Sequence, residues 1–275
     1  MRKYYTRPCN FHYGDCANRL IKTKNALPLA GNKKIAFDKI EVFYRVKKKI
    51  TKSNTYSISE IKKLHKYLRL QVSSDLKKIT KKRKNINHIK FDKPKIMGIL
   101  NVTPDSFSDG GLYFDEDDAI QHANLMINSG ASIIDIGGES TRPGSKTVNE
   151  KDEWERVEGV ISKLKKKFPK IPISLDTRKS YVMKNGIKNK INIINDVSGL
   201  KFDKNSFKII NNKKIPFVLH HMQGTPNSMQ INPKYDDVLL EIYDFFEKKI
   251  NFCKKKKYKR ELIILDPGIG FGKNL

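Results

Sequence analysis

Polar residues follow apolar runs at three places in this chain where chemistry could be carried out. In the first stretch, Met97–Gly111, the apolar run 96–100 breaks at Asn101 into a loop of Thr, Pro, Asp, Ser and Gly. The stretches Ser132–Ser145 and Glu261–Lys273 repeat this order. A short apolar run bounded by turn residues indicates a buried strand, and loops held by a rigid scaffold often carry binding and catalytic groups. We therefore expect loops that present polar side chains from strand ends.

Three short acceptor side chains lie at predicted strand ends, Asp176, Asn195 and Asp266. Such groups can accept paired hydrogen bonds from the guanidine-like edge of a pterin or guanine ring. The fork of Arg142 suits a phosphate, and the amide oxygen of Asn101 is a ligand that Mg²⁺ accepts while it keeps most of its waters. Together these residue types predict a pocket for a pterin that carries a pyrophosphate.

Several residues near the same strand ends also have a purely structural interpretation. Asp135 lies within a predicted strand, and we favour a paired buried carboxylate there. His220 and His221 resemble zinc ligands by type, but adjacent strand residues point to opposite sides of a sheet, which favours structural histidines. Gly110–Gly111 and Gly270–Gly272 could serve turn geometry alone.

Apolar strand candidates alternate with helical patterns from residue 96 onward. Strands are predicted at 96–100, 132–136, 171–175, 191–195, 215–220 and 261–265. Helices are predicted between them at about 116–129, 151–168, 179–187, 203–211 and 235–256. This alternation indicates an α/β protein built of parallel βα units, with both faces of the sheet covered.

Two architectures fit these units, a (β/α)8 TIM barrel and an open six-stranded sheet. Polar candidate residues at nearly every strand end favour the barrel, and no GxGxxG phosphate fingerprint follows the first strand. Residues 96–275 amount to 180 positions, whereas a barrel takes about 250 residues. We therefore predict a TIM barrel of which about six βα units are present, and we expect the sequence to be truncated after its sixth strand.

A small basic α+β segment is predicted before the barrel, with the boundary between 1–94 and 95–275. A strand is predicted over Lys34–Val46. A helix is predicted over about Ser57–Leu70, because Ser57 and Glu60 fit a capping box. The charge run Lys77–Lys84 is interpreted as a solvated linker or helix face. The sequence does not indicate what this segment does.

Composition restricts the partners and the compartment. Residues 1–96 hold 27 Lys and Arg against 6 Asp and Glu, but only 10 of the 56 basic residues in the chain are Arg. Specific readers of nucleic acid rely on Arg and aromatic platforms, so we do not expect nucleic acid as the main partner. Three cysteines form no disulfide framework in a chain of this length, which indicates reduced thiols and a cytoplasmic protein. No signal peptide or apolar run of about 18 residues occurs, so no membrane span is expected.

Six segments of the chain resemble, in content and order, the signature segments of the dihydropteroate synthase family. They read NVTPDSFSDGG, GGESTRPGS, SLDT, INDVSG, HMQGTP and DPGIGFGK, and the resemblance spans residues 96–275. It implies a Mg²⁺-dependent transferase of folate biosynthesis. Such an enzyme condenses 7,8-dihydropterin-6-ylmethyl diphosphate with p-aminobenzoate, giving 7,8-dihydropteroate and pyrophosphate.

The resemblance also implies roles for matched residues. Asn101 would hold Mg²⁺ and the pyrophosphate. The pterin would be bound by Asp176, Asn195, Asp266, Met222 and Phe271. Asp105 of the first loop would stabilise the carbon that becomes cationic as the leaving group departs, and Thr141 and Arg142 would act from the second loop. The p-aminobenzoate pocket would be formed by Ser106, Phe107 and Pro143.

Some features depart from the family or leave other functions open. The family's seventh-strand Lys and eighth-strand Arg-x-His would lie beyond Leu275, so we expect little activity from 275 residues alone. A homodimer is expected for the full-length family member. A methyltetrahydrofolate-binding methyltransferase domain is an alternative, although Arg142 and the SFSDGG loop argue against it because a methylated folate brings no pyrophosphate. From another class, a non-catalytic pterin- or RNA-binding protein would use the basic segment.

Overall fold

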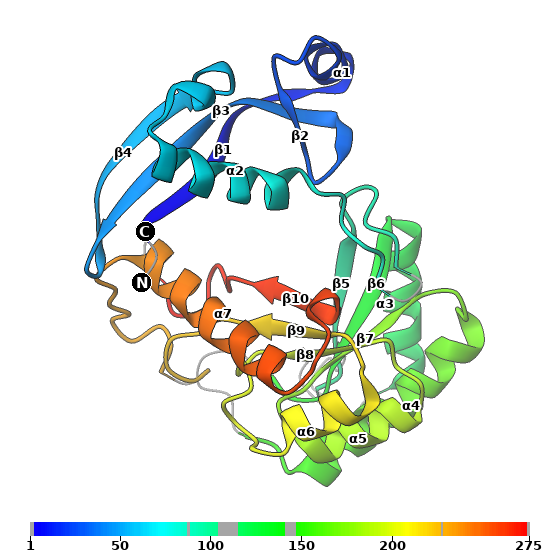
Figure 1. Cartoon of the computed structure of the whole chain (residues 1–275). Helices are drawn as coiled ribbons and strands as arrows, with labels where there is room; N and C mark the ends of the chain where they lie inside the picture. Colours follow the sequence, from blue (N-terminus) through cyan, green and yellow to red (C-terminus); the bar gives the residue numbers. More distant parts are fainter. Residues whose placement is uncertain (1–2, 87–88, 104–114, 141–146, 227, 274–275) are drawn as a thin grey trace. The chain divides into compact units, whose positions relative to one another are not determined.

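A computed structural model describes residues 3–86, 89–103, 115–140, 147–226 and 228–273 of the chain (Figure 1). The chain divides into two compact units. The first comprises Met1–Asn85, Lys90–Lys93 and Tyr235–Glu241, and the second comprises Ile86–Ile89, Pro94–Lys234 and Ile242–Leu275. Each unit has a hydrophobic core of its own.

The first unit is built on a four-stranded antiparallel sheet. Its strands are β1 (Tyr4–Tyr13), β2 (Leu27–Leu29), β3 (Asn32–Val46) and β4 (Lys49–Ser57). The long strand β3 pairs with each of the other three. The strand predicted at 34–46 is therefore confirmed as the centre of this sheet.

The helices of the first unit begin and end at other residues than the sequence predicts. They are α1 (Gly14–Lys22), the 3-10 helix η1 (Ser59–Lys63) and α2 (Lys66–Thr80). The backbone N–H of Ser57 donates to Glu60 Oε2 at 2.7 Å, but this contact precedes η1 and not a long helix. The helix predicted over 57–70 is wrong in its bounds, because the backbone becomes extended at Leu64 and α2 begins after His65. It continues to Thr80 because Leu68, Val72 and Leu76 extend its buried stripe.

The second unit contains a parallel six-stranded sheet in which every strand lies beside its neighbours in sequence. The strands are β5 (Ile96–Asn101), β6 (Ala131–Gly137), β7 (Ile173–Asp176), β8 (Ile193–Asp196), β9 (Phe217–His220) and β10 (Ile263–Asp266). Their order across the sheet is β10-β9-β8-β7-β6-β5. A doubly wound sheet reverses its strand order at a switch point, and no reversal occurs among these strands. The βα pattern read from the sequence is confirmed, and the order of these strands is not that of a doubly wound sheet.

Helices follow the first five strands of this sheet. They are α3 (Glu116–Asn128), α4 (Glu150–Lys167), α5 (Ser180–Lys188), α6 (Ser206–Lys213) and α7 (Val238–Lys255), and the 3-10 helix η2 (Arg260–Leu262) precedes β10. The side chains of Asp115 and Asn149 cap α3 and α4 by accepting backbone N–H groups in the first turn, as such residues do at helix starts. Within the described residues, none of the helices combines the length and apolar character that a membrane span needs.

One face of the parallel sheet packs against these helices. The strand residues in this core include Leu100, Ile136, Leu175, Ile194 and Phe217, which lie in one row across five strands. Helices α3 to α7 all contribute side chains to the same core. The expectation that helices cover both faces is therefore corrected, since the described helices of this unit cover one face. The opposite face carries the polar residues considered next.

Candidate functional site

Polar side chains gather on the sheet face opposite the helices, at the carboxyl ends of the strands. Side chains alternate between the two faces along a strand, and paired residues of a parallel sheet share a face. The strand register places four residues in one row across β5 to β8, Asn101, Gly137, Asp176 and Asn195. This row comes one residue after the core row, so it belongs to the other face. The sheet thus brings Asn101, Asp176 and Asn195 together.

Asp135 lies on the same face, two residues before Gly137. The Nδ2 of Asn195 donates to Asp135 Oδ2 at 2.8 Å. The Asp135 side chain is buried, and burial raises the pKa of its carboxyl. The interpretation of Asp135 as a paired buried carboxylate is confirmed. Its partner is one of the predicted pterin-binding residues, so Asp135 belongs to this polar face.

Asp176 has no such partner. No hydrogen bond or ion pair joins its carboxyl to the other described residues, and it lies among acidic groups. Burial and the nearby Asp135 carboxylate raise the pKa of Asp176 well above its usual range. A Cβ at position 137 would lie 3.5 Å from Asn101 Oδ1 and 3.5 Å from Asp176 Cβ. A side chain at this position would therefore pack in van der Waals contact between the two residues, and glycine leaves that volume unfilled.

Asp266 lies two strands from Asn195, at a separation of about 10 Å across the sheet. It pairs in register with His220, and Asn195 pairs with Val218, two residues before His220, so all three polar residues share one face. Asp266 Oδ2 lies 3.1 Å from His220 Nδ1, and Asp266 Oδ1 accepts the backbone N–H of Gly268 at 2.7 Å. The bond to His220 is the largest of the effects that lower the pKa of Asp266. The site therefore contains two carboxyl groups of opposite tendency. The pKa of Asp266 is lowered, which favours the ionised form, and the pKa of Asp176 is raised, which favours the protonated form.

The remaining predicted ring-contacting residues follow β9 and β10. The Phe271 ring meets the His220 ring edge-on, with centroids 4.7 Å apart. Met222 is buried, and its carbonyl accepts Lys201 Nζ at 3.3 Å. Lys273 Nζ donates to the carbonyl oxygens of His221, Gly268 and Phe271 at 3.2, 2.8 and 3.0 Å, which ties the loop after β10 to the end of β9.

Four buried polar atoms on this face have no hydrogen-bond partner among the described residues: Asp135 Oδ1, Ser174 Oγ, Asn195 Oδ1 and His220 Nε2. Buried polar atoms in proteins are normally paired, and an unmet one costs about 1–3 kcal/mol. Unmet atoms gathered on one face are typical of a face that binds a polar ligand, and Asn195 Oδ1 is one acceptor available to it. The described residues hold no group of three or more His, Cys, Asp and Glu side chains arranged for a metal ion.

The other predicted site residues lie outside the described part of the chain: Asp105, Ser106, Phe107, Thr141, Arg142 and Pro143. Their assignment stays a prediction. Glu139 and Val148 lie on either side of residues 141–146. The Glu139 carboxylate accepts the backbone N–H of Val148 and the Nε–H of Arg178, both at 2.9 Å. Lys179 Nζ lies 3.1 Å from Glu139 and also pairs with the buried Glu153 of α4.

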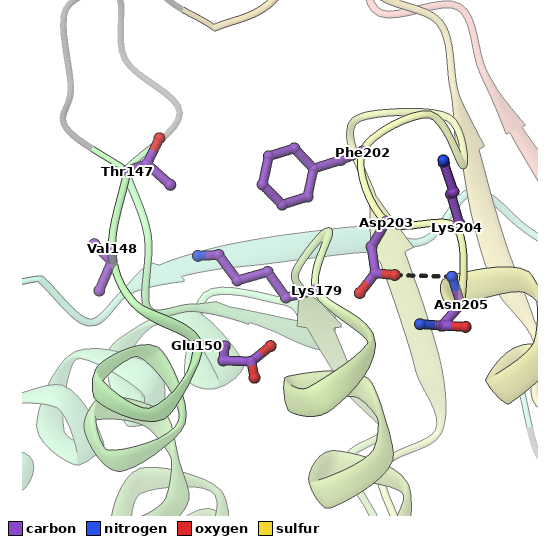
Figure 2. Close-up of a pocket in the computed structure, with 8 residues that line it drawn as sticks. All are labelled: Thr147, Val148, Glu150, Lys179, Phe202, Asp203, Lys204 and Asn205. Carbon is purple, nitrogen blue, oxygen red and sulfur yellow. Dashed lines mark hydrogen bonds between the residues drawn. The ribbon is translucent and has the colours of Figure 1, made fainter.

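A pocket of about 530 Å³ lies beside these ion pairs, at the loops that follow β6, β7 and β8 (Figure 2). Its lining consists of Thr147, Val148, Glu150, Lys179, Phe202, Asp203, Lys204 and Asn205. The Arg178 guanidinium stacks on the Phe202 ring at 4.0 Å from the centroid. The Asp203 carboxylate accepts the backbone N–H groups of Ser180 and Asn205, both at 2.8 Å, and so occupies the amides at the starts of two helices.

The family model for pterin binding enzymes matches residues 97–275. This chain belongs to the pterin binding enzyme family. Its similarity to individual members is high. The dihydropteroate synthase of Escherichia coli strain K12 is 47% identical over 182 residues, which are 66% of this chain and 64% of that protein. The enzyme of the same name from Neisseria meningitidis serogroup C is 44% identical over 189 residues, 68% of this chain and 66% of its own length.

Solved structures of pterin binding enzymes superpose on the same part of the chain. The Yersinia pestis dihydropteroate synthase in a sulfonamide drug complex gives a TM-score of 0.62 at 43% identity, over 67% of this chain and 66% of that one. The Xanthomonas albilineans dihydropteroate synthase with 4-aminobenzoic acid gives 0.61 at 38% identity, over 66% and 64%. The same Xanthomonas enzyme in complex with 7,8-dihydropteroate gives 0.58 at 34% identity, over 67% and 64%. The chain thus spans about two thirds of the length of the family members it matches.

Two polar contacts near the candidate site did not follow from the sequence. The interpretation of His220 as a structural histidine agrees with its hydrogen bond to Asp266, but the sequence did not indicate that partner. Only the register between β9 and β10 reveals this contact, and the sequence does not give that register. The buried pair of Lys179 and Glu153 was also missed. Glu153 had one signal, because it precedes Val157 by four residues and so shares the apolar stripe of α4.

Proposed function

We propose that this chain acts as a dihydropteroate synthase of folate biosynthesis. It would condense 7,8-dihydropterin-6-ylmethyl diphosphate with p-aminobenzoate and release pyrophosphate. The observation that carries the proposal is the group of unmet buried polar atoms on one sheet face, together with the family to which residues 97–275 belong. The names and bound molecules of the relatives support the same reaction: one Xanthomonas structure holds 4-aminobenzoic acid and another holds 7,8-dihydropteroate.

The polar face suits a pterin because the ring presents donors and acceptors along one flat edge. Asp266 is held ionised by His220 and Gly268, so it can accept two hydrogen bonds from the 2-amino and N3 groups. Asn195 Oδ1 is a second unpaired acceptor. The raised pKa of Asp176 favours its protonated form, which can donate a hydrogen bond to a ring nitrogen or oxygen. Hydrogen-bond acceptors and a hydrogen-bond donor for the pterin ring therefore lie on the same face of the sheet.

The family implies a magnesium ion. Asn101 and its neighbour Gly137 could accommodate such an ion when it enters bound to the diphosphate of the substrate. Asn101 offers a single amide oxygen, and because residue 137 is a glycine no side chain fills the volume beside that oxygen. Mg²⁺ commonly takes one or two protein oxygens, with waters and substrate phosphates as its other ligands. When bound, the ion would neutralise charge on the departing pyrophosphate. Asn101 would orient the diphosphate end of the substrate relative to Asp176.

The remaining assignments are proposals of the same kind. Asp105 and Arg142 would stabilise charge during transfer, and Thr141 would bind substrate. Ser106, Phe107 and Pro143 would enclose p-aminobenzoate. The six-stranded sheet would form part of a (β/α)8 barrel, whose catalytic residues lie at the carboxyl ends of its strands. The active protein would be a homodimer that requires no membrane or nucleic acid.

A competition experiment separates this function from that of a methyltetrahydrofolate-binding domain. Fluorescence-monitored binding of 7,8-dihydropterin-6-ylmethyl diphosphate to the 275-residue chain, with Mg²⁺ in excess, should resist displacement by methyltetrahydrofolate. Addition of p-aminobenzoate to the complex should release pyrophosphate, at the low rate expected of 275 residues alone, measured with a coupled enzymatic assay. Preferential binding of methyltetrahydrofolate, without pyrophosphate release, would reject the synthase and support the methyltransferase class.

A further inference from the structure

Two buried polar side chains contact predicted pterin-binding residues. Asp135 accepts a hydrogen bond from Asn195, and His220 contacts Asp266. His220 ends β9, is only 3% exposed, and lies on the same sheet face as Asn195 and Asp266. Its Nδ1 lies 3.1 Å from Asp266 Oδ2. An ionised carboxylate can only accept a hydrogen bond, so Nδ1 carries the hydrogen and donates a hydrogen bond to Oδ2.

The surroundings of the ring hold it in this orientation. Phe271 packs edge-on against one side of the imidazole. Gly268 approaches the other nitrogen so closely that a Cβ at position 268 would lie 2.7 Å from His220 Nε2 and 2.2 Å from the His221 carbonyl oxygen. Gly268 also has a φ of +65°, which a residue with a side chain rarely adopts. Glycine at 268 thus lets one turn support both Asp266, through its N–H, and the ring of His220.

The charged and titratable groups near this pair come from β9 and from the loop after β10. Lys273 donates to the carbonyl oxygens of Gly268 and Phe271 after β10 and of His221 after β9, and it lowers the pKa of Asp266 only as a minor effect, behind His220 and Gly268. His221 lies on the opposite side of β9, where its ring meets Phe245. Burial lowers the pKa of His221 to about 4, so His221 carries no charge at neutral pH. The contact to His220 is therefore the strongest single influence on the Asp266 carboxylate.

We propose that His220 is a positioning residue for the pterin: its Nδ1–H fixes Asp266 as an oriented carboxylate that receives the amino edge of the ring. Both oxygens of Asp266 are then held by one donor each, from His220 and Gly268, with their remaining lone pairs facing the ligand. This inference rests on the proposed function, since it assigns the ring edge to Asp266. It does not make His220 a catalytic residue, because His220 acts through Asp266.

Three variants at position 220 separate the hydrogen bond from the shape of the side chain. His220→Leu fills the space but removes the donor. His220→Asn places an amide N–H near the position of Nδ1, whereas His220→Gln places it near Nε2. The inference predicts that affinity for 7,8-dihydropterin-6-ylmethyl diphosphate falls about tenfold in His220→Leu, the usual effect of losing a hydrogen bond to a charged group. His220→Asn should restore most of the affinity, and His220→Gln should not.

Two readouts distinguish positioning from a structural role. The first needs no ligand: carbon-13 NMR of the Asp266 carboxyl follows its titration in each variant, and its pKa should rise in His220→Leu and return in His220→Asn. The second is the pH dependence of pterin binding by calorimetry. Because His220 lowers the pKa of Asp266, binding should weaken at a higher pH in His220→Leu than in the wild-type chain as the solution is acidified. Affinity for p-aminobenzoate should not change.

The outcomes separate this inference from the function on which it rests. An unchanged Asp266 pKa in His220→Leu, or equal pterin affinity in His220→Leu and the wild-type chain, would overturn the positioning role. Weakening of pterin binding by the same factor in all three variants would also overturn it, since it would report only a disturbed fold. A wild-type chain that binds no pterin at all would overturn the proposed function, and with it the assignment of a pterin to Asp266.

Discussion

The two faces of the parallel sheet are made by the same strands, yet they differ in every physical respect. Leu175 and Ile194 point toward the helices and are fully buried in an apolar core. Asp176 and Asn195, the very next residues, point to the other face and lie among buried polar atoms that lack partners. A shift of one residue along a strand therefore exchanges a stabilising side chain for a site residue. The comparison shows that stability and ligand binding are encoded on alternate positions of the same strands.

The largest expected effect comes from the helix-covered face. Leu175→Ala removes a fully buried side chain and should lower the free energy of unfolding by about 2–5 kcal/mol. Asp176→Ala, one residue further on, removes a carboxyl that lies among other acids and should cause no comparable loss. Urea denaturation followed by circular dichroism measures both. Equal destabilisation by the two variants would show that both faces of the sheet contribute equally to stability, against the assignment of stability to one face and ligand binding to the other.

The adjacent histidines at the end of β9 provide the next test, and the second of them, His221, directly follows the strand. Burial lowers the pKa of His221 to about 4, below its value of about 6.5 in the unfolded chain. Between these values the unfolded chain binds a proton that the folded chain excludes, so stability is present above pH 6.5 and is lost as the pH falls toward 4. The loss amounts to about 3 kcal/mol. Chemical denaturation across this range should show a shallower fall in His221→Gln, and an unchanged slope would contradict the assignment.

The effect of Asp176 on stability should have the opposite pH dependence to that of His221, because it should weaken the fold as the pH rises. Its folded-state pKa is raised, so its contribution is present at low pH and is lost as the pH rises through that pKa. Asp176→Asn keeps the shape but cannot ionise. This variant should be more stable than the wild-type chain at pH 8, and the difference should vanish near pH 4. Thermal unfolding at several pH values measures it, and a variant less stable at pH 8 would contradict the account.

The alternation of strands and helices was predictable because apolar runs of four to eight residues and stripes such as Trp154, Val157 and Ile161 are local patterns. The register was not predictable, because it depends on contacts between residues far apart in sequence. The motifs therefore indicated Asp176, Asn195 and Asp266 as a group, but not that Asn195 bonds to Asp135 or that Asp266 bonds to His220. The bounds of α2 also escaped prediction, because local capping chemistry at Ser57 and Glu60 serves a 3-10 turn.

The central claim is that the polar face of the sheet binds a pterin, and isothermal titration calorimetry tests it most directly. The 275-residue chain is titrated with 7,8-dihydropterin-6-ylmethyl diphosphate in excess Mg²⁺, beside Asp176→Ala and a folded sample of Leu175→Ala. The account predicts one pterin bound per wild-type chain, unchanged affinity in Leu175→Ala, and affinity at least about a hundredfold weaker in Asp176→Ala. Tight binding by Asp176→Ala would contradict it.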